Sequence, residues 1–338
     1  MNQLYPLKFK PIFKEKVWGG NRLVSILNKP FPEQKRIGES WEISGVEGNI
    51  SVVENGFLAD NNLQELIEVY MGDLVGESVY EQFGLEFPLL IKFIDANEPL
   101  SVQVHPTDEI AEKRHGGFGK TEMWYIIDAT KDALIFSGFN HEMDKAHYLN
   151  HLQKKEFVQI LNQFKTKPNE VFYIPSGRVH AIGAGVLLAE IQQSSDITYR
   201  IYDWDRTDEV GNSRELHTEL ATDAIDFKTY DDYRIEYPKT KNNPSKIISN
   251  KYFQTNIIDF DKPVERDCLL LDSFVIFMCM EGESDLVYYE NEIIRIKKGE
   301  TVLVPSVIEQ IKLVPVNQCK VLEVFLPVNA YEQKSFLH

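Results

Sequence analysis

Most of the chain consists of short segments rich in valine, isoleucine, phenylalanine and tyrosine, separated by turns that carry glycine, proline, asparagine or aspartate. Such side chains suit the pleated, half-buried surface of a sheet, and the turn residues end each segment. The clearest predicted strands are residues 87–94, 122–127, 133–136, 170–174, 186–192, 274–280, 285–289 and 301–304. Strands of this kind bury one face by packing in layers, so the sequence predicts a mainly β protein.

Helical periodicity occurs in only two stretches, residues 62–83 and 141–164, where apolar residues recur three and four positions apart. Predicted strands lie on both sides of the second stretch, so we expect a short helical insertion at about 141–165. Residues 237–245 (YPKTKNNPS) are polar, contain two prolines and form the predicted linker. At about 150 residues per domain, a chain of 338 residues is expected to form two domains.

An internal similarity joins the two predicted domains. Residues 167–182 read KPNEVFYIPSGRVHAI, and residues 297–312 read KKGETVLVPSVIEQIK. The shared pattern is short. The alternative is therefore that two similar strand–turn–strand units arose by chance. We favour duplication because the flanking strands also agree. The alignment places Gln310 opposite His180, so a metal bound at this position would be held by the first domain alone.

Charge and cysteine content narrow the class of protein. The formal net charge is −16, which repels polyanions, so neither nucleic acid nor an anionic membrane is an expected partner. Residues 1–9 show no signal-peptide pattern. The three cysteines form no C-x-x-C pair, so we expect reduced thiols and a cytoplasmic location. Any metal would therefore need histidine, carboxylate or amide ligands.

Polar side chains gather at two places among the apolar strands. In the segment LSVQVHP, alternation puts Ser101, Gln103 and His105 on one face of a strand. In the segment GKTEMWYII, Lys120 and Glu122 point the same way. Ordinary interpretations remain for each group, because a lone histidine on a strand is often merely exposed. A surface Lys–Glu pair likewise contributes little.

A third polar segment, N-x5-P-S-G-x-x-H, runs from Asn169 to His180 through a tight turn. The three polar segments together would supply an amide oxygen, two imidazoles and a carboxylate, from Gln103, His105, His180 and Glu122. This set suits Zn²⁺ or another borderline divalent ion and leaves room for a water or a substrate oxygen. The residues therefore predict one metal site.

The same segments resemble a known family. The turn N-x5-P-S-G-x-x-H is similar to the second cupin motif, G-x5-P-x-G-x-x-H, with Asn169 in place of the glycine. The first cupin motif usually reads H-x-H with a glutamate shortly after, whereas this chain has Gln103-x-His105 and then Glu122. The order LSVQVHP, GKTE, PSGRVHA and AEIQQSSDITYR, between about residues 6 and 214, resembles type I phosphomannose isomerases in their compact bacterial form.

The resemblance implies a fold of two cupin (RmlC-like) jelly-roll domains. Residues 1–240 would form the catalytic, metal-binding domain with the helical insertion, and residues 241–338 a degenerate cupin domain. It also implies a zinc-dependent aldose–ketose isomerase that interconverts mannose 6-phosphate and fructose 6-phosphate through an enediol. The ligands implied for zinc are Gln103, His105, Glu122 and His180, and Gln103 is absent from some compact members.

Further roles follow from the resemblance alone. Arg200 matches the active-site arginine and would stabilise the enediolate. Ser101, Lys120, Glu190 and Arg206 match positions that line the substrate pocket, and Ser101, Lys120 and Arg206 are available to the phosphate. Glu190 is the first candidate for the general base, with an orienting role as the alternative, and Lys120 or a bound water is a further candidate. An ion pair with Asp203 or Asp205 is the alternative for Arg206.

Other functions remain open from the sequence. One alternative is another sugar-phosphate isomerase on the same scaffold, or an Fe²⁺ dioxygenase, although dioxygenases usually have a set of ligands richer in histidine. The other alternative is a non-catalytic sugar-binding or regulatory cupin. Loss of a ligand or of Arg200 would favour it, but the sequence retains both. The exposed edges of the predicted sheets would also support a homodimer. An anionic substrate would need local cations, because the chain as a whole is acidic.

Overall fold

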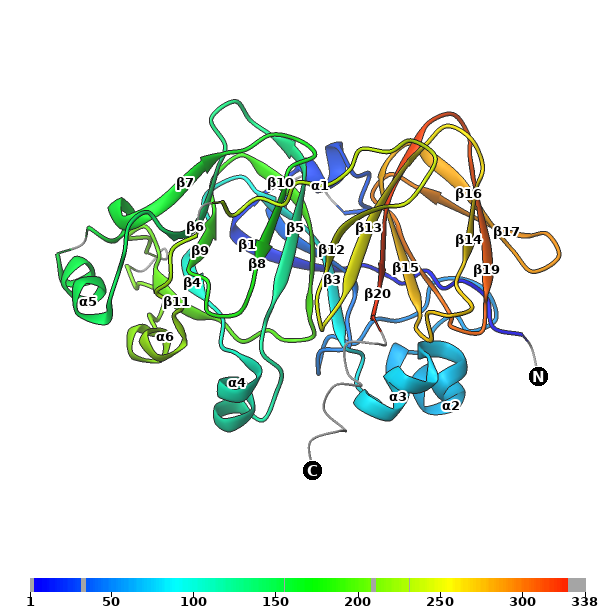
Figure 1. The fold of residues 1–338 in the computed structure, drawn as a ribbon, viewed down its shortest axis with the longest axis horizontal. Coiled ribbons are helices and arrows are strands. Elements are labelled where there is room, and N and C mark those ends of the chain that lie inside the picture. The colour runs from blue at the N-terminus through cyan, green and yellow to red at the C-terminus, as the bar shows by residue number, and fades with distance from the viewer. Residues whose placement is uncertain (1–2, 32–34, 155, 208–210, 231, 328–338) are drawn as a thin grey trace.

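The first half of the chain builds two antiparallel sheets that pack face to face (Figure 1). The computed structural model describes residues 3–31, 35–154, 156–207, 211–230 and 232–327. Sheet I has the order β1 (Ile12–Gly20), β2 (Ile37–Ile43), β3 (Leu89–Ala96), β10 (Val186–Gln193), β5 (Glu122–Ala129) and β8 (Val171–Ile174). Sheet II has the order β11 (Tyr199–Tyr202), β4 (Val102–Val104), β9 (His180–Ile182), β6 (Leu134–Phe139) and β7 (Leu161–Lys165).

The second half builds a smaller sandwich of two sheets. Sheet III has the order β12 (Ser245–Ser249), β13 (Gln254–Phe260), β20 (Cys319–Phe325), β15 (Val275–Glu281) and β18 (Thr301–Val304). Sheet IV has the order β14 (Val264–Asp267), β19 (Gln310–Pro315), β16 (Glu283–Tyr288) and β17 (Glu292–Lys297). The expectation of a mainly β, cupin-type fold is confirmed, and each of the eight predicted strands overlaps an observed one.

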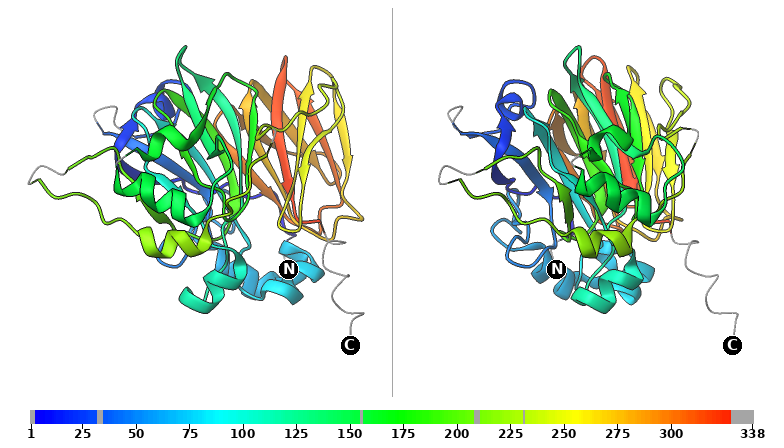
Figure 2. Two further views of the ribbon diagram at one scale, coloured as in Figure 1. Left: turned by 60° about the vertical axis from the view of Figure 1, so that its left-hand side comes forward. Right: turned by 90° about the vertical axis from the view of Figure 1, so that its left-hand side faces the viewer.

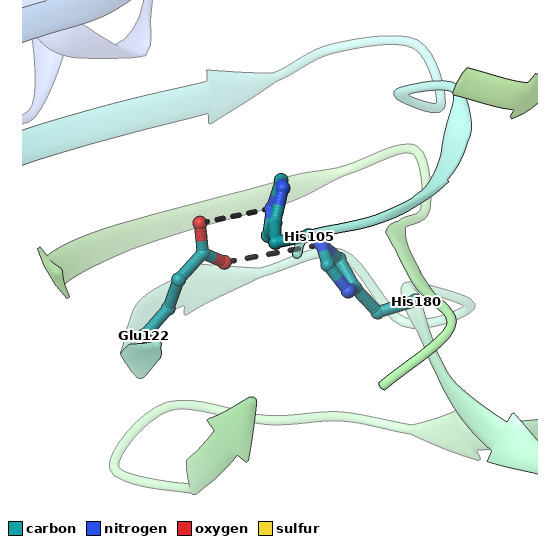
Figure 3. A group of neighbouring side chains, drawn as sticks. All are labelled: His105, Glu122 and His180. Carbon is teal, nitrogen blue, oxygen red and sulfur yellow. Dashed lines mark ion pairs between the residues drawn. The ribbon is translucent and has the colours of Figure 1, made fainter. Parts of the chain in front are cut away.

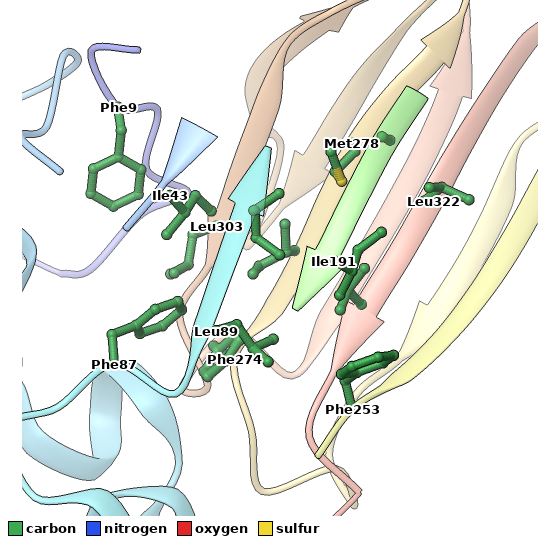
Figure 4. Packing of buried hydrophobic residues seen from close by; sticks show 14 of the residues in the cluster. Phe9, Ile43, Phe87, Leu89, Ile191, Phe253, Phe274, Met278, Leu303 and Leu322 are labelled. Carbon is green, nitrogen blue, oxygen red and sulfur yellow. The ribbon is translucent and has the colours of Figure 1, made fainter. Parts of the chain in front are cut away.

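Sheets I and III share the largest hydrophobic core, so the two sandwiches lie side by side as four layers of strands (Figure 2). Ile191 of sheet I and Met278 and Leu322 of sheet III are fully buried in this core (Figure 4). The N-terminal segment belongs to both halves, because Leu7 forms a β-bridge with Leu303. The boundary between residues 240 and 241 therefore stays a prediction, although every described strand up to β11 lies in the first sandwich.

The order of the strands supports duplication over chance. Read across each sheet, β2-β3-β10-β5-β8 corresponds to β12-β13-β20-β15-β18, and β4-β9-β6-β7 corresponds to β14-β19-β16-β17. One detail of the sequence alignment is wrong, because Gln310 is exposed. Ile311 is buried and pairs with Arg266, as His180 pairs with Gln103. The turns before β9 and β19 each contain five residues, so the difference lies in which residue of β19 faces inward, and a shift by one residue exchanges the faces of a strand.

The helices agree only in part with prediction. The stretch at 62–83 forms α2 (Leu63–Val75) and α3 (Glu77–Phe83), separated at Gly76, whose φ of 99° favours glycine. The insertion forms α5 (Lys145–Gln153) and a 3-10 turn, η1 (Phe157–Ile160), but residues 161–165 pair with β6 as strand β7. The apolar residues of this segment are spaced as in a helix. The segment nevertheless pairs with β6, which would otherwise be the edge strand of sheet II.

The remaining helices are α1 (Arg22–Ser25), α4 (Asp108–His115) and α6 (Thr218–Ala224). Helix α4 lies at the lower end of the first sandwich in Figure 1, directly after β4. No helix among the described residues is long and apolar enough to cross a membrane. The three cysteines are free and buried, with Cys279 Sγ 3.8 Å from Cys319 Sγ.

Candidate metal centre

Three predicted ligands lie close together in the first sandwich (Figure 3). His105 directly follows β4 and His180 begins β9, so both come from sheet II, whereas Glu122 begins β5 of sheet I. Their nearest ligand atoms all lie within 4.8 Å of one another. His105 Nε2 is 3.2 Å from Glu122 Oε1, and His180 Nε2 is 3.9 Å from Glu122 Oε2. The three side chains are buried, so the sandwich brings two imidazoles and a carboxylate to one point.

Backbone carbonyls orient both imidazoles. His105 Nδ1 lies 3.0 Å from the carbonyl oxygen of Ile197, and His180 Nδ1 lies 2.7 Å from that of Arg178. A carbonyl can only accept a hydrogen bond, so each Nδ1 carries the proton and donates it. Each Nε2 is then the unprotonated nitrogen on the side of Glu122, which is the tautomer that metal-binding histidines usually adopt.

The charges at the centre favour a cation. Burial, with Lys120 as a second cause, lowers the pKa of His105 to about 3, and burial lowers the pKa of His180 to about 4. Burial alone would raise the pKa of Glu122, but the charge of Lys120 and the contact with His105 hold it well below its usual range. At neutral pH the residues therefore present two neutral imidazoles and a carboxylate.

Several of these buried acceptors lack a hydrogen-bond donor. Within the described ranges, His105 Nε2 and both carboxylate oxygens of Glu122 have none. Lys120 Nζ lies 3.0 Å from Glu122 Oε1 and neutralises its charge, but without the alignment of a hydrogen bond. Unpaired buried acceptors are costly, and a divalent cation at their convergence would satisfy them. The residues present therefore fit a metal.

Gln103 stands next to the cluster. It pairs directly with His180 across β4 and β9, and its Nε2 lies 3.3 Å from His180 Nε2. A half-turn of the amide exchanges nitrogen and oxygen and would direct Oε1 to the same place as the other ligand atoms. Ser101 is buried two residues before Gln103 on the same face of the chain.

Arg200 extends the same row of residues. It lies on β11 directly opposite Gln103, and opposed residues of neighbouring strands project to one face of a sheet. Arg200 Nη1 donates to the carbonyl oxygen of Glu215 at 2.8 Å, whereas its Nε is buried with no hydrogen-bond partner in the described part of the chain. Burial and the neighbouring Arg214 lower the pKa of Arg200.

Arg206 is held by other protein groups. It forms an ion pair with Asp203, and its Nη1 donates to the carbonyl oxygen of Pro99 at 2.8 Å. Asp203 also accepts from Arg214 Nε at 2.7 Å. The alternative considered for Arg206, an ion pair with Asp203, is confirmed, and its contact with phosphate stays a prediction.

Glu190 uses both oxygens within the protein. Oε2 accepts from Lys92 Nζ at 2.8 Å, and Oε1 accepts from Trp124 Nε1 at 2.8 Å. Lys92 also donates to Gln192 Oε1 at 2.5 Å. The ring of Trp124 lies edge-on to that of His180, with 5.3 Å between centroids. Burial and the charge of Glu122 raise the pKa of Glu190.

The sequence analysis missed Lys92, Trp124 and Gln192. A signal was present, because Lys92 and Gln192 are polar residues within the otherwise apolar predicted strands at 87–94 and 186–192. Burial would lower the pKa of Lys92, but the charges of Glu190 and Glu39 raise it instead. A buried lysine of this kind must have a carboxylate partner, and here the partner is Glu190.

Antiparallel jelly-roll sandwiches with a buried His–Glu–His cluster at their strand ends define the class of metal-binding cupin proteins. Comparison with known proteins narrows this class. The model of the phosphomannose isomerase type I catalytic domain matches residues 6–169. The chain is 36% identical to the mannose-6-phosphate isomerase ManA of Bacillus subtilis, over 93% of this chain and 97% of that protein. The chain therefore belongs to the type I phosphomannose isomerase family.

Other relatives agree with this assignment. A mannose-6-phosphate isomerase of Streptococcus mutans is 40% identical over 65% of this chain and 67% of its own length. The crystal structure of the mannose 6-phosphate isomerase from Bacillus subtilis superposes with a TM-score of 0.84 at 32% identity, covering 94% of this chain and 99% of the other. A mutant of the phosphomannose isomerase from Salmonella typhimurium shares the fold, with a TM-score of 0.78 at 17% identity over 95% and 99% of the two chains.

Proposed function

We propose that this chain is a metal-dependent isomerase that interconverts D-mannose 6-phosphate and D-fructose 6-phosphate. The observation that carries the proposal is the convergence of His105 Nε2, His180 Nε2 and the Glu122 carboxylate in a member of this family. These three residues, with Gln103 as the fourth, would hold one ion. Two imidazoles, a carboxylate and an amide oxygen suit Zn²⁺.

The reaction moves a proton between C2 and C1 of the sugar, and negative charge develops on the neighbouring oxygens as the enediol forms. A bound divalent cation supplies positive charge at those oxygens. Arg200 would add a permanent cation on the same face, because it lies in one row with Gln103 and His180. Its Nε, which has no partner among the described residues, would donate to an oxygen of the substrate.

The proton must be taken and returned by a side chain near the reacting carbons. Glu190 was the first candidate from the sequence, but Lys92 and Trp124 occupy its two oxygens. These contacts support the orienting alternative, in which Glu190 fixes Trp124 against His180. We therefore assign the proton transfer to Lys120, which would take the proton as the neutral amine and return it as the ammonium; its Nζ lies 3.0 Å from Glu122 Oε1.

The phosphate is assigned to the other end of the same strand. Ser101 lies about 7 Å along the chain from Gln103, a distance comparable with the length of a sugar ring. Arg206 lies beside this end, since it donates to the carbonyl oxygen of Pro99. Arg200 and Arg206 would form a local group of cations, which an acidic protein needs for an anionic substrate.

The decisive experiment measures formation of fructose 6-phosphate from mannose 6-phosphate in a coupled assay. We expect activity in the zinc-replete protein, loss on treatment with a chelator and recovery on adding Zn²⁺ back. Glucose 6-phosphate under the same conditions is the control substrate, because it differs only in the configuration at C2. Absence of turnover in the metal-replete protein would refute the proposed function.

A further inference from the structure

The carboxylate of Asp108 joins the metal-centre segments to the C-terminal sandwich. Asp108 begins α4, three residues after His105. Its Oδ1 accepts from the backbone nitrogen of Gly119 at 3.1 Å and from Gln193 Nε2 at 2.9 Å. Its Oδ2 accepts from Lys251 Nζ at 2.9 Å and from the hydroxyl of Tyr252 at 2.5 Å. One half-buried side chain thus contacts both sandwiches.

On the side of the first sandwich, these contacts hold the backbone around Lys120. Gly119 is fixed to Asp108, and a side chain there would place Cβ 2.6 Å from the Asp108 nitrogen, so only glycine permits this approach. The nitrogen of Lys120 donates to the carbonyl oxygen of Pro106 at 3.2 Å. The nitrogen of Thr121 donates to Gln193 Oε1 at 2.9 Å. The Lys120 loop, residues 119–121, is therefore held at every residue.

On the side of the C-terminal sandwich, the donors to Asp108 are themselves fixed. Lys251 and Tyr252 lie in the turn between β12 and β13. Asn250 Oδ1 accepts from the nitrogens of Tyr252 and Phe253 at 2.8 and 3.0 Å. Phe253 is fully buried in the core shared by sheets I and III. The position of the Tyr252 hydroxyl is therefore set by the packing of the second sandwich.

We propose that Asp108 is a positioning residue through which the C-terminal sandwich holds the Lys120 loop at the metal centre. The inference rests on the proposed function. It gives the C-terminal sandwich a role in turnover, although Ile311 stands opposite Arg266 where His180 faces Gln103, and Arg266 forms an ion pair with the buried Glu323. Since Lys120 has a long side chain, its backbone must be fixed before its Nζ can reach one place reproducibly.

The test compares Tyr252→Phe with the matched control Lys320→Met. Tyr252→Phe removes one oxygen from the bond to Asp108. Lys320→Met removes another bond between the two halves, from Lys320 Nζ to Asn169 Oδ1 at 2.9 Å, together with the ion pair of Lys320 with Glu281. Each protein is assayed for backbone hydrogen exchange of residues 119–121, for bound metal, and for kcat and KM with mannose 6-phosphate.

We expect Tyr252→Phe to speed exchange of the Lys120 loop and to lower kcat about tenfold, with KM and bound metal unchanged. Asp108→Ala is expected to lower kcat about a hundredfold, and Asp108→Asn should restore part of the loss. Lys320→Met should keep the wild-type kcat and exchange. If Asp108→Ala fails to fold, Tyr252→Phe alone decides.

Equal exchange and equal kcat in Tyr252→Phe and Lys320→Met would overturn the inference. Loss of metal in Tyr252→Phe would also overturn it, because Asp108 would then act on the ligands and not on Lys120. An inactive wild-type protein would refute the proposed function. The exchange data would then test the positioning contact separately: faster exchange of the Lys120 loop in Tyr252→Phe, but not in Lys320→Met, would still support it.

Discussion

Gln103 and His180 face each other across β4 and β9, with their side-chain nitrogens Nε2 3.3 Å apart. The pair belongs to a row that continues to Arg200 on β11, so three functional groups project from one line of sheet II. Glu122 completes the centre from sheet I. The positions of the predicted site residues therefore have two different origins. Strand pairing within sheet II places the row, whereas the packing of sheet I against sheet II places Glu122.

Removal of a ligand should remove the metal. We expect His180→Ala to lose its bound metal on dialysis and to lack isomerase activity, because one of two oriented imidazoles is gone. Gln103→Ala should keep metal but bind it more weakly, by about tenfold. Metal-to-protein ratios measured by elemental analysis test both. His147→Ala, on the exposed face of α5, is the control and should match the wild type; retention of metal by His180→Ala would contradict the assignment.

Arg200 should act on turnover and not on metal binding. Its side chain donates to the carbonyl oxygen of Glu215, its backbone bonds His217, and it lies opposite Gln103; no hydrogen bond joins it to the three clustered ligands in the described structure. We expect Arg200→Ala to lower kcat by about 10²–10³-fold while leaving the metal content unchanged, as for loss of a group that stabilises developing charge. Arg200→Lys should recover part of the activity. Loss of metal from Arg200→Ala would show a structural role instead.

The buried pair of Lys92 and Glu190 should be important for stability. Both side chains are almost inaccessible to water, so removing one leaves an unpaired buried charge or forces its neutralisation. Lys92→Met is expected to lower the free energy of unfolding by about 3–5 kcal/mol, measured by denaturant titration. The double variant Lys92→Met with Glu190→Gln should lose less than the sum of the two single variants. Lys165→Met, at an exposed ion pair, should change stability little.

Acid should destabilise the metal-free protein through its two ligand histidines. Their pKa values are about 3 and about 4 when folded, against the ordinary 6.5. As the pH falls below 6.5, the unfolded chain binds protons that the folded protein does not, so stability falls towards pH 4. At pH 5 the loss is about 2 kcal/mol for each histidine. Melting temperatures of chelator-treated protein at pH 7 and pH 5 measure this effect. His180→Gln should show a smaller drop, and an equal drop in the two proteins would contradict the prediction.

Strand positions and ligand types were predictable because both are local properties. Alternation along LSVQVHP is enough to place Ser101, Gln103 and His105 on one face, whatever the rest of the chain does. The same reasoning was wrong at residues 161–165, where apolar spacing fits a helix and the free edge of sheet II forms a strand instead. It also missed the shift by one residue in β19, where Gln310 is exposed and Ile311 is buried.

By itself, the sequence determined which chemical groups this protein can offer to a metal and along which strands they lie. Only the tertiary structure decided how those groups act. The carbonyls of Ile197 and Arg178 orient the two histidines, Lys92 and Trp124 occupy the oxygens of Glu190, and Tyr252 reaches Asp108 from the other sandwich. Most of these contacts join residues that are far apart in the chain. The contact of His180 with Arg178 is local but depends on the conformation of the turn between them. Their distances arise when the sheets pack and bury them, which no local pattern encodes.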